Sequence, residues 1–318
     1  MAAACPFPPP LPLSFLGPSS RGVGLRLSPY VYRAGAGLAQ ALPDAVATGV
    51  AAPLGAALAL VMPARRRTVA RHLQRASGGR LGGGELTREV RRAFHSYARY
   101  WIESFRLPRL DGAAIDDAFS ADGMEHIDRA LAAGRGAILA VPHLGGWDFA
   151  AAWLVRRGYA LTVVVETVEP PELLAWFTDL RSQMGLAVVP LGPGAGQAVM
   201  RSLRANNVVA LLCDRDIGGG GVDVDFFGER TRVPAGPATL ALRTGAALLP
   251  TAIYFRGRTG HRAEIRPPLP LERRGTFRAD VARVSQALVI EIESLIRAAP
   301  HQWHLFQPNW PSDPGYGR

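Results

Sequence analysis

The sequence predicts an α/β protein with a central, mainly parallel sheet flanked by helices, and a helical region ahead of the sheet. Three observations support this fold class. After Asp111, short apolar runs alternate with helix-like segments; a long uncharged segment precedes them; and 48% of the 318 residues are hydrophobic while 19% are charged. Such alternation is typical of parallel sheets covered on both faces. The composition excludes a wholly disordered or collagen-like chain.

The first 62 residues contain two uncharged or nearly uncharged segments of different character. Residues 1–25 include six prolines among small residues, which predicts a disordered tail because little apolar area is available to offset the cost of ordering. They lack the pattern of a secretory signal. Residues 45–62 carry no charge and reach the lower length limit for crossing a bilayer. Alanine, glycine and Pro53 dominate the run, which favours a buried or interfacial helix over a spanning one.

Arginine is concentrated directly after this apolar segment. All 36 positive side chains are arginines, the net charge is +10, and residues 63–109 hold twelve arginines against three glutamates. The planar fork of donors on arginine suits phosphate oxygens. We therefore expect residues 26–110 to form a helical, membrane-associating region, docked peripherally on the anionic cytoplasmic face of the cell membrane. The alternative is a solvated helical face.

The α/β domain is expected over residues 111–312. Buried strands are predicted at 136–141, 161–165, 187–190, 208–212 and 246–255. Helices are predicted between and after them, at 122–133, 147–157, 171–184, 195–205, 235–244 and 279–298. Cys5 and Cys213 match no metal or redox spacing, and a reducing, cytoplasmic setting is expected.

The first predicted strand of this domain runs directly into a candidate catalytic residue, His143. Gly145 and Gly146 follow it and permit a tight turn at the sheet edge where α/β proteins bind ligands. Asp148 is five residues from His143, too far around an ideal helix to share its face, but a loop that opens a helix can fold back and let the carboxylate accept from the imidazole. That pairing would make His143 a general base for a substrate hydroxyl. The alternative is a histidine that caps a turn.

Three motifs in this order resemble the glycerolipid acyltransferase superfamily. They are PHLGGWDFAAAWL at 142–154, LLCDRDIGGGGVDVDFFGERTRVPAGPATLALRTGAALLP at 211–250 and WHLFQPNW at 303–310. The similarity covers about residues 26–310 and is to the branch that contains phosphatidylinositol mannoside acyltransferases and lipid A late acyltransferases. The glycine run and the order of DRD, DFFGE and PAGPA are more similar to the mannoside enzymes.

The resemblance implies an enzyme that moves a fatty acyl group, expected to be palmitoyl, from acyl-coenzyme A to a mannose hydroxyl of phosphatidylinositol mannosides. It implies that His143 is the base, that Asp148 orients it, and that no covalent intermediate forms. Acyl-coenzyme A would be a co-substrate, with no bound cofactor and no metal. By their placement, Glu166 and Arg181 resemble polar residues of the catalytic groove of the family. Arg181 would stabilise the oxyanion or hold a phosphate.

Further substrate-binding candidates follow the predicted strand at 208–212. Aspartates and glutamates would accept from sugar hydroxyls and arginines would meet phosphates; the residues are Asp214, Arg215, Asp216, Asp223, Asp225, Glu229 and Arg232. A salt-bridged loop is the alternative for the DRD segment. Near the C-terminus, Trp303, Phe306 and Trp310 favour an aromatic lipid interface or the closure of an apolar groove over a metal site at His301 and His304.

Two other functions remain as alternatives. A lipid A-type acyltransferase would take its acyl group from acyl carrier protein, which would dock on the basic stretch at 63–109. A nucleic-acid-binding protein would also use arginines, but the basic stretch lacks interleaved aromatic residues and a recognition motif, so no nucleic-acid partner is expected.

Overall fold

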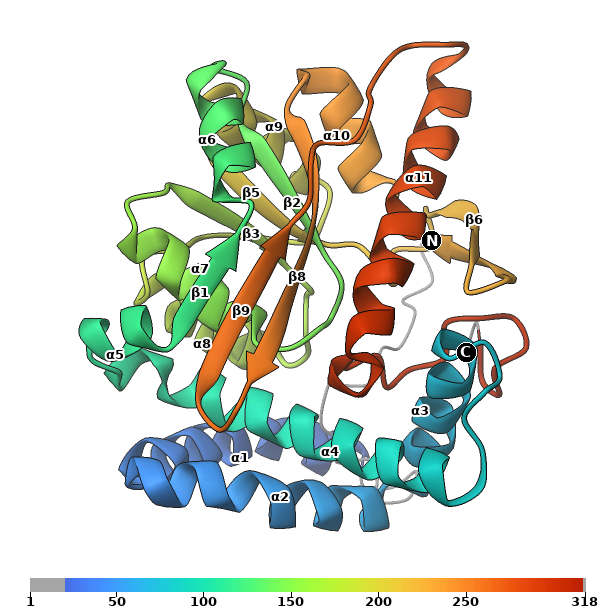
Figure 1. Cartoon of the computed structure of the whole chain (residues 1–318). Coiled ribbons are helices and arrows are strands. Elements are labelled where there is room, and N and C mark those ends of the chain that lie inside the picture. The colour runs from blue at the N-terminus through green and yellow to red at the C-terminus, as the bar shows by residue number, and fades with distance from the viewer. Residues whose placement is uncertain (1–20, 317–318) are drawn as a thin grey trace.

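A seven-stranded sheet runs through the middle of the molecule in the computed structural model, which describes residues 21–316 (Figure 1). Its strand order is β1-β9-β8-β2-β5-β3-β4. The strands are β1 Phe119–Asp122, β2 Ala137–Val141, β3 Leu161–Val165, β4 Ala187–Pro190, β5 Val208–Leu212, β8 Ala247–Arg256 and β9 Gly260–Ile265. Strands β8, β2, β5, β3 and β4 are parallel, whereas β9 and β1 run the other way. The α/β fold with a mainly parallel sheet is confirmed.

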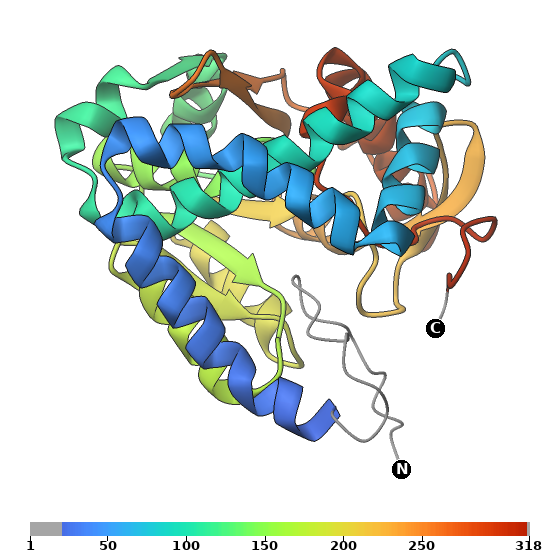
Figure 2. The ribbon, with the colours of Figure 1, turned by 90° about the horizontal axis from the view of Figure 1, so that it is seen from below.

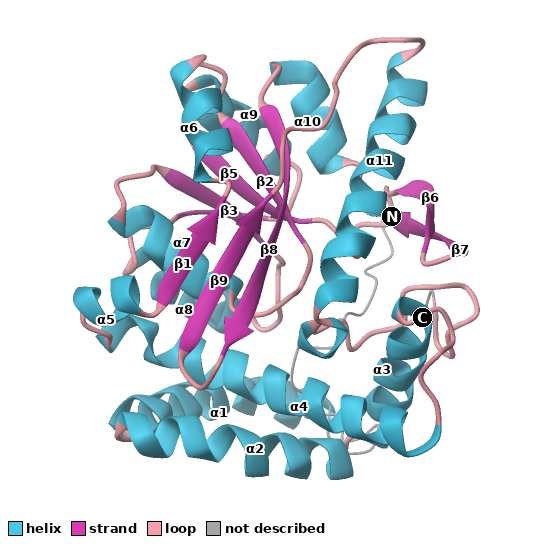
Figure 3. Cartoon of the chain, in the orientation of Figure 1, coloured by secondary structure: helices cyan, strands magenta, loops and turns pink. Residues whose placement is uncertain are grey.

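Helices cover both faces of this sheet (Figure 3). Strand β2 is buried along its whole length: Ile138 and Ala140 join the core on one face, and Leu139 and Val141 join the core on the other. This two-sided burial explains why the strand is a continuous apolar run. One face packs against α9 Ala195–Arg204, α10 Gly236–Thr244 and α11 Phe277–Ala298; the other packs against α5 Gly112–Asp117, α6 Met124–Ala132 and α7 Trp147–Arg156.

Two further pieces complete the α/β part of the chain. Helix α8, Pro171–Ser182, precedes β4, and the turn η3, Pro300–Gln302, follows α11. A separate antiparallel hairpin, β6 Val222–Phe226 and β7 Glu229–Val233, packs beside α11. No strand was predicted here, only substrate-binding residues. The alternation of apolar and charged residues in VDVDF and ERTRV is the strand signal that was overlooked.

The helical region lies beneath the sheet in Figure 1 and faces the viewer in Figure 2. It comprises α1 Arg21–Ala41, α2 Asp44–Val61, α3 Pro63–Ala76, α4 Gly83–Arg106 and the turn η2 Leu107–Arg109. Helix α4 lies between the sheet and the pair α1 and α2. On α2, small residues at four-residue spacing, Ala47, Ala51, Gly55 and Ala59, form the buried stripe. A side chain at Gly55 would come within 2.7 Å of the His95 backbone, so the alanine and glycine content of α2 allows close packing on α4.

Helix α1 begins at Arg21, inside the stretch that was predicted to be a disordered tail. The predicted disordered tail, residues 1–25, lies mostly outside the described residues, and 21–25 belong to α1. Between residues 21 and 316, no individual helix has the length and apolarity needed to cross a bilayer. The segments Val46–Val61 and Pro63–Ala76 satisfy those criteria only as a pair, and they meet at a bend of 105°.

Candidate active site

His143 lies in the short loop between the end of β2 and the start of α7. Gly145 adopts a φ of 63° there, and a side chain on it would meet the Ile253 carbonyl oxygen at 2.0 Å, so the turn requires glycine. Two contacts fix the backbone of His143: its N–H donates to Asp214 Oδ2 at 3.0 Å, and its carbonyl oxygen accepts from the N–H of His304 at 2.7 Å. The loop therefore holds the imidazole at the carboxyl edge of the sheet.

The carboxylate that contacts the imidazole is Asp214, not Asp148. His143 Nδ1 lies 2.7 Å from Asp214 Oδ1, and the Asp214 side chain is fully buried. Burial alone would raise the pKa of Asp214, but the charge and hydrogen bonds of His143, together with the hydrogen bond from Trp303, outweigh it and lower that pKa. Because an ionised carboxylate only accepts, the neutral form of the His143 ring in this contact has its proton on Nδ1 and its lone pair on Nε2.

Asp148 has different partners, which corrects the expectation that it orients His143. Its Oδ1 accepts from Arg181 Nε at 3.0 Å, and its Oδ2 accepts from Arg181 Nη2 at 3.1 Å and from the Tyr100 hydroxyl at 2.7 Å. Asp148 lies in the first turn of α7, and this position directs its carboxylate to α8 and α4. Burial would lower the pKa of Arg181, but the Asp148 charge raises it, so the pair is a buried, bidentate ion pair.

A cavity of about 590 Å³ opens beside His143. Its walls are mostly apolar, and they come from β2, β8, β9 and α7: Leu139, Val141, Ala150, Ala151, Trp153, Ile253, Ala263 and Ile265 are among them. Five of the site residues predicted from the sequence belong to its polar lining: His143, Asp148, Glu166, Arg181 and Arg215. Glu166 and Arg215 are themselves paired, with Arg215 Nη2 at 2.7 Å from Glu166 Oε2. The site thus combines an apolar cavity with the His143 imidazole and two ion pairs.

The remaining sequence-predicted residues lie outside this cavity. Asp216 accepts from the Gly221 N–H within its own loop at 2.9 Å. Asp223 and Arg232 pair with each other, both about half exposed, across the β6–β7 hairpin. The backbone N–H of Asp225 donates to Gln286. Glu229 binds Arg75 and Ser312. The hairpin therefore does not bring these side chains to His143.

The C-terminal aromatic residues are buried in the protein, which contradicts a lipid interface, the first of the two roles predicted for them. Trp303 and Trp310 belong to the core on the α11 side of the sheet, and Phe306 packs with Phe94 and Tyr97 of α4. His304 lines the cavity, with Nε2 at 2.8 Å from the Ser96 hydroxyl, and burial lowers its pKa to about 3. His301 lies instead beside Arg92 and Glu89.

Comparison with known proteins identifies the family. The family model described as bacterial lipid A biosynthesis acyltransferase matches residues 25–312. The chain belongs to this acyltransferase family. It is similar to a phosphatidylinositol mannoside acyltransferase of Mycobacterium tuberculosis, with 43% identity over 70% of each chain. It is also similar to a protein of the same name from Mycolicibacterium smegmatis, with 38% identity over 89% of this chain and 91% of that one. A lipid A biosynthesis acyltransferase of Haemophilus influenzae is 28% identical over 57% of this chain and 55% of its own length.

Three residues of this acyltransferase donate hydrogen bonds to Asp148 or Asp214, and the sequence analysis did not predict these contacts. Tyr100 donates to Asp148, Trp303 Nε1 donates to Asp214 Oδ2 at 2.7 Å, and Asn309 Nδ2 donates to the Asp214 carbonyl oxygen at 3.1 Å. Trp303 and Asn309 belong to the WHLFQPNW motif, so a signal was present. Its aromatic content was read as a surface for lipid, whereas indole N–H and amide groups are also donors for a buried carboxylate.

Proposed function

We propose that this chain transfers a fatty acyl group, palmitoyl in our proposal, from acyl-coenzyme A to a mannose hydroxyl of a phosphatidylinositol mannoside, with His143 as general base. The observation that carries the proposal is the position of His143 at an apolar cavity, with Nδ1 held by Asp214. The names of the mycobacterial relatives, at 38% and 43% identity, support the choice of acceptor.

The proposed reaction is a direct transfer. Nε2 of His143 removes the proton from the acceptor hydroxyl as its oxygen attacks the thioester carbonyl, and the carboxylate of Asp214 stabilises the resulting imidazolium. The tetrahedral intermediate then collapses: the carbon–sulfur bond breaks, and the imidazolium returns the proton to the coenzyme A thiolate. The products are an ester and a free thiol, so no acyl-enzyme is needed.

The apolar cavity would hold the acyl chain. Its volume of about 590 Å³ lies within the range of small-molecule sites, roughly 300–1,000 Å³. Each methylene group moved out of water into such walls contributes about 0.8 kcal/mol. A long chain would therefore gain most of its affinity from the apolar walls, while the thioester stays beside His143.

The polar residues near His143 would meet the charged parts of the substrates. Arg181 is held rigidly by Asp148, and Arg215 is held by Glu166, so each presents its guanidinium without much loss of side-chain freedom on binding. We assign Arg181 to the oxyanion or to a phosphate, and Glu166 and Arg215 to the acceptor headgroup. These roles follow the placement of both pairs in the lining of the cavity.

We further propose peripheral docking of α1 and α2 on the cytoplasmic face of the cell membrane. Apolar residues of these helices are exposed on their outer sides, including Tyr30, Leu38, Val46, Leu54, Leu60 and Val61. Arg66 and Arg67 are exposed in the first turn of α3, directly after α2. An apolar helix face bordered by arginines suits an anionic bilayer surface.

The test is a transfer assay with purified protein, palmitoyl-coenzyme A and a phosphatidylinositol mannoside, read by the mass gain of the lipid. We expect His143→Ala to lower kcat by roughly 10²–10⁴-fold, because a positioned base contributes about that much. His95→Ala is the matched control, since His95 is an exposed histidine on α4. Full activity of His143→Ala would overturn the proposed base. Parallel reactions with palmitoyl-acyl carrier protein and a lipid A precursor distinguish the lipid A-type alternative.

A further inference from the structure

The segment from Gln302 to Asp313, which we call the C-terminal strap, runs alongside the loop that holds His143. The N–H of Gly145 donates to the Gln302 carbonyl at 3.0 Å, and the N–H of His304 donates to the His143 carbonyl at 2.7 Å. Leu144 and Trp303 form an antiparallel bridge between these bonds. The strap is thus paired through its backbone with His143 and with the two residues that follow it.

The strap also donates two hydrogen bonds to Asp214, the partner of His143. Trp303 Nε1 donates to Asp214 Oδ2 at 2.7 Å, and Asn309 Nδ2 donates to the backbone carbonyl of Asp214 at 3.1 Å. Oδ2 accepts as well from the backbone N–H of His143 at 3.0 Å, which leaves Oδ1 for His143 Nδ1. The indole N–H therefore helps to decide which carboxylate oxygen faces the imidazole.

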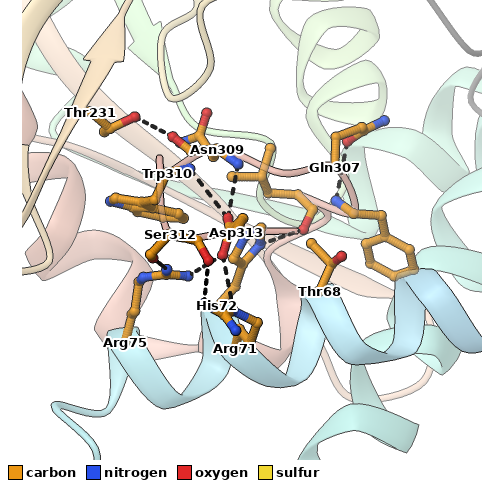
Figure 4. A network of polar contacts seen from close by, with 12 residues as sticks. Thr68, Arg71, His72, Arg75, Thr231, Gln307, Asn309, Trp310, Ser312 and Asp313 are labelled. Carbon is orange, nitrogen blue, oxygen red and sulfur yellow. Dashed lines mark hydrogen bonds and ion pairs between the residues drawn. The ribbon is translucent and has the colours of Figure 1, made fainter. Parts of the chain in front are cut away.

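A buried cluster on Asp313 fixes the far end of the strap to α3 (Figure 4). Asp313 is 3% exposed and accepts from His72 Nε2 at 3.1 Å, from Arg75 Nη1 at 2.8 Å and from Arg71 Nε at 3.2 Å. It also accepts from two N–H groups of the strap itself, those of Asn309 and Trp310. With both ends fixed, the strap has little freedom to withdraw Trp303 from Asp214.

We propose that Trp303 is a positioning residue, whose indole N–H holds the Asp214 carboxylate in the orientation that aligns His143 for proton transfer. This inference rests on the proposed function, because it takes His143 as the base. Trp303 is buried beside Phe226, Phe227 and Trp310, so its ring also packs in the core. The inference concerns the N–H group alone, and the packing role must be separated from it by experiment.

Trp303→Phe removes the N–H and keeps most of the ring. Trp310→Phe is the matched control: Trp310 lies in the same strap and the same aromatic cluster, but its Nε1 donates to the Phe226 carbonyl at 3.0 Å. We expect Trp303→Phe to lower kcat by about tenfold or more, the effect of one hydrogen bond to a charged group, with KM for both substrates changed less than about twofold. Trp310→Phe should lose similar thermal stability and keep kcat.

The hydrogen-bond network can also be followed by NMR without an activity assay. The His143 Hδ1 resonance, assigned by its absence in His143→Ala, should shift in Trp303→Phe and stay in place in Trp310→Phe. If Trp303→Phe does not fold, the same contact can be tested from the other side by comparing the indole N–H signals of Asp214→Asn with those of the wild type. The Trp303 signal should shift and the Trp310 signal should not.

Three results would overturn the inference: an unchanged kcat in Trp303→Phe, an equal fall of kcat in both tryptophan variants, or indole and imidazole signals that do not respond. Failure of the proposed function has a different signature, namely full transfer by His143→Ala or no transfer by the wild type. In that case the NMR comparison still decides whether Trp303 orients Asp214.

Discussion

His143 and Asp214 meet because of strand register. Strands β2 and β5 are parallel neighbours, with Val141 opposite Leu212, so the residues two positions beyond each strand end come side by side. The five-residue spacing from His143 to Asp148 led the sequence analysis to a local partner, whereas the partner in the structure comes from the neighbouring strand, 71 residues away. The position of His143 at the sheet edge was predictable from the sequence, but its carboxylate partner depended on a strand order that the sequence does not display.

We expect Asp214→Asn to lower kcat by roughly 10²–10⁴-fold with the fold retained. Two donors, the His143 N–H and Trp303 Nε1, point at Oδ2, so the amide oxygen must take that position. The amide NH₂ then faces Nδ1 of His143, which forces the ring proton onto Nε2 and removes the lone pair needed for catalysis.

Steady-state kinetics and circular dichroism check this prediction. Asp216→Asn is the control, since Asp216 lies two residues further along the same loop and binds the Gly221 N–H. Activity of Asp214→Asn within about twofold of the control would show that the tautomer of His143 does not depend on this carboxylate.

Among the elements, the buried parallel strands and their helices were the most predictable part of the fold. The ranges 161–165, 187–190 and 208–212 match β3, β4 and β5, because each is a short run made almost wholly of apolar residues. Strands β1, β9, β6 and β7 were missed. They alternate buried and exposed residues over only 4–6 positions, as in the GHRAEI of β9, and charged residues at every second position resemble a loop.

The contact between α3 and the C-terminal strap predicts a pH-dependent contribution to stability. Burial would raise the pKa of Asp313, but hydrogen bonds and charge from His72 and Arg75 and the backbone N–H of Asn309 hold it well below its ordinary value. The native state therefore binds this proton less tightly than the unfolded state. The stabilisation is present in full above the ordinary pKa of 3.8 and is lost as the pH falls through the lower, native pKa.

We expect Asp313→Asn to lower the free energy of unfolding by about 3 kcal/mol at pH 7, since it leaves the largely buried Arg75 without its carboxylate partner. The difference from wild type should be constant from pH 7 to about 5 and should shrink below about pH 4. Urea unfolding at several pH values measures it. Asp223→Asn, in an exposed pair with Arg232, should cost less than about 1 kcal/mol. A deficit for Asp313→Asn that stays equally large at pH 3 would contradict the assignment.

Across the whole molecule, α4 joins the helical region to the sheet. Arg99 of α4 donates to the carbonyls of Gly257 and Gly260 at the β8–β9 turn, and Glu103 pairs with His261 of β9. On its other side α4 carries α2 and α1. Tyr97, Tyr100 and Trp101 of α4 also line the cavity, so one helix separates the cavity from the proposed docking face.

We expect Leu60→Asp to weaken binding to vesicles that contain phosphatidylinositol by about tenfold, because Leu60 would bury its side chain in the bilayer interface. Leu60 is 73% exposed near the end of α2. Ile290→Asp is the control: Ile290 is 57% exposed on α11, away from the helical region. Co-sedimentation with vesicles measures both variants. Equal binding by the two variants would place the docking face elsewhere.

The backbone pairing of Leu144 with Trp303 also bears on the order in which the enzyme is made. Synthesis runs from the amino end, and domains generally begin to fold as they leave the ribosome. When the last strand of the sheet, β9, has been synthesised to Ile265, the nascent chain contains His143 and Asp214. It does not yet contain Trp303, which donates to Asp214 and pairs with Leu144. The hydrogen bond from Trp303 to Asp214 would thus form last, after the N-terminal helices and the strands that line the cavity.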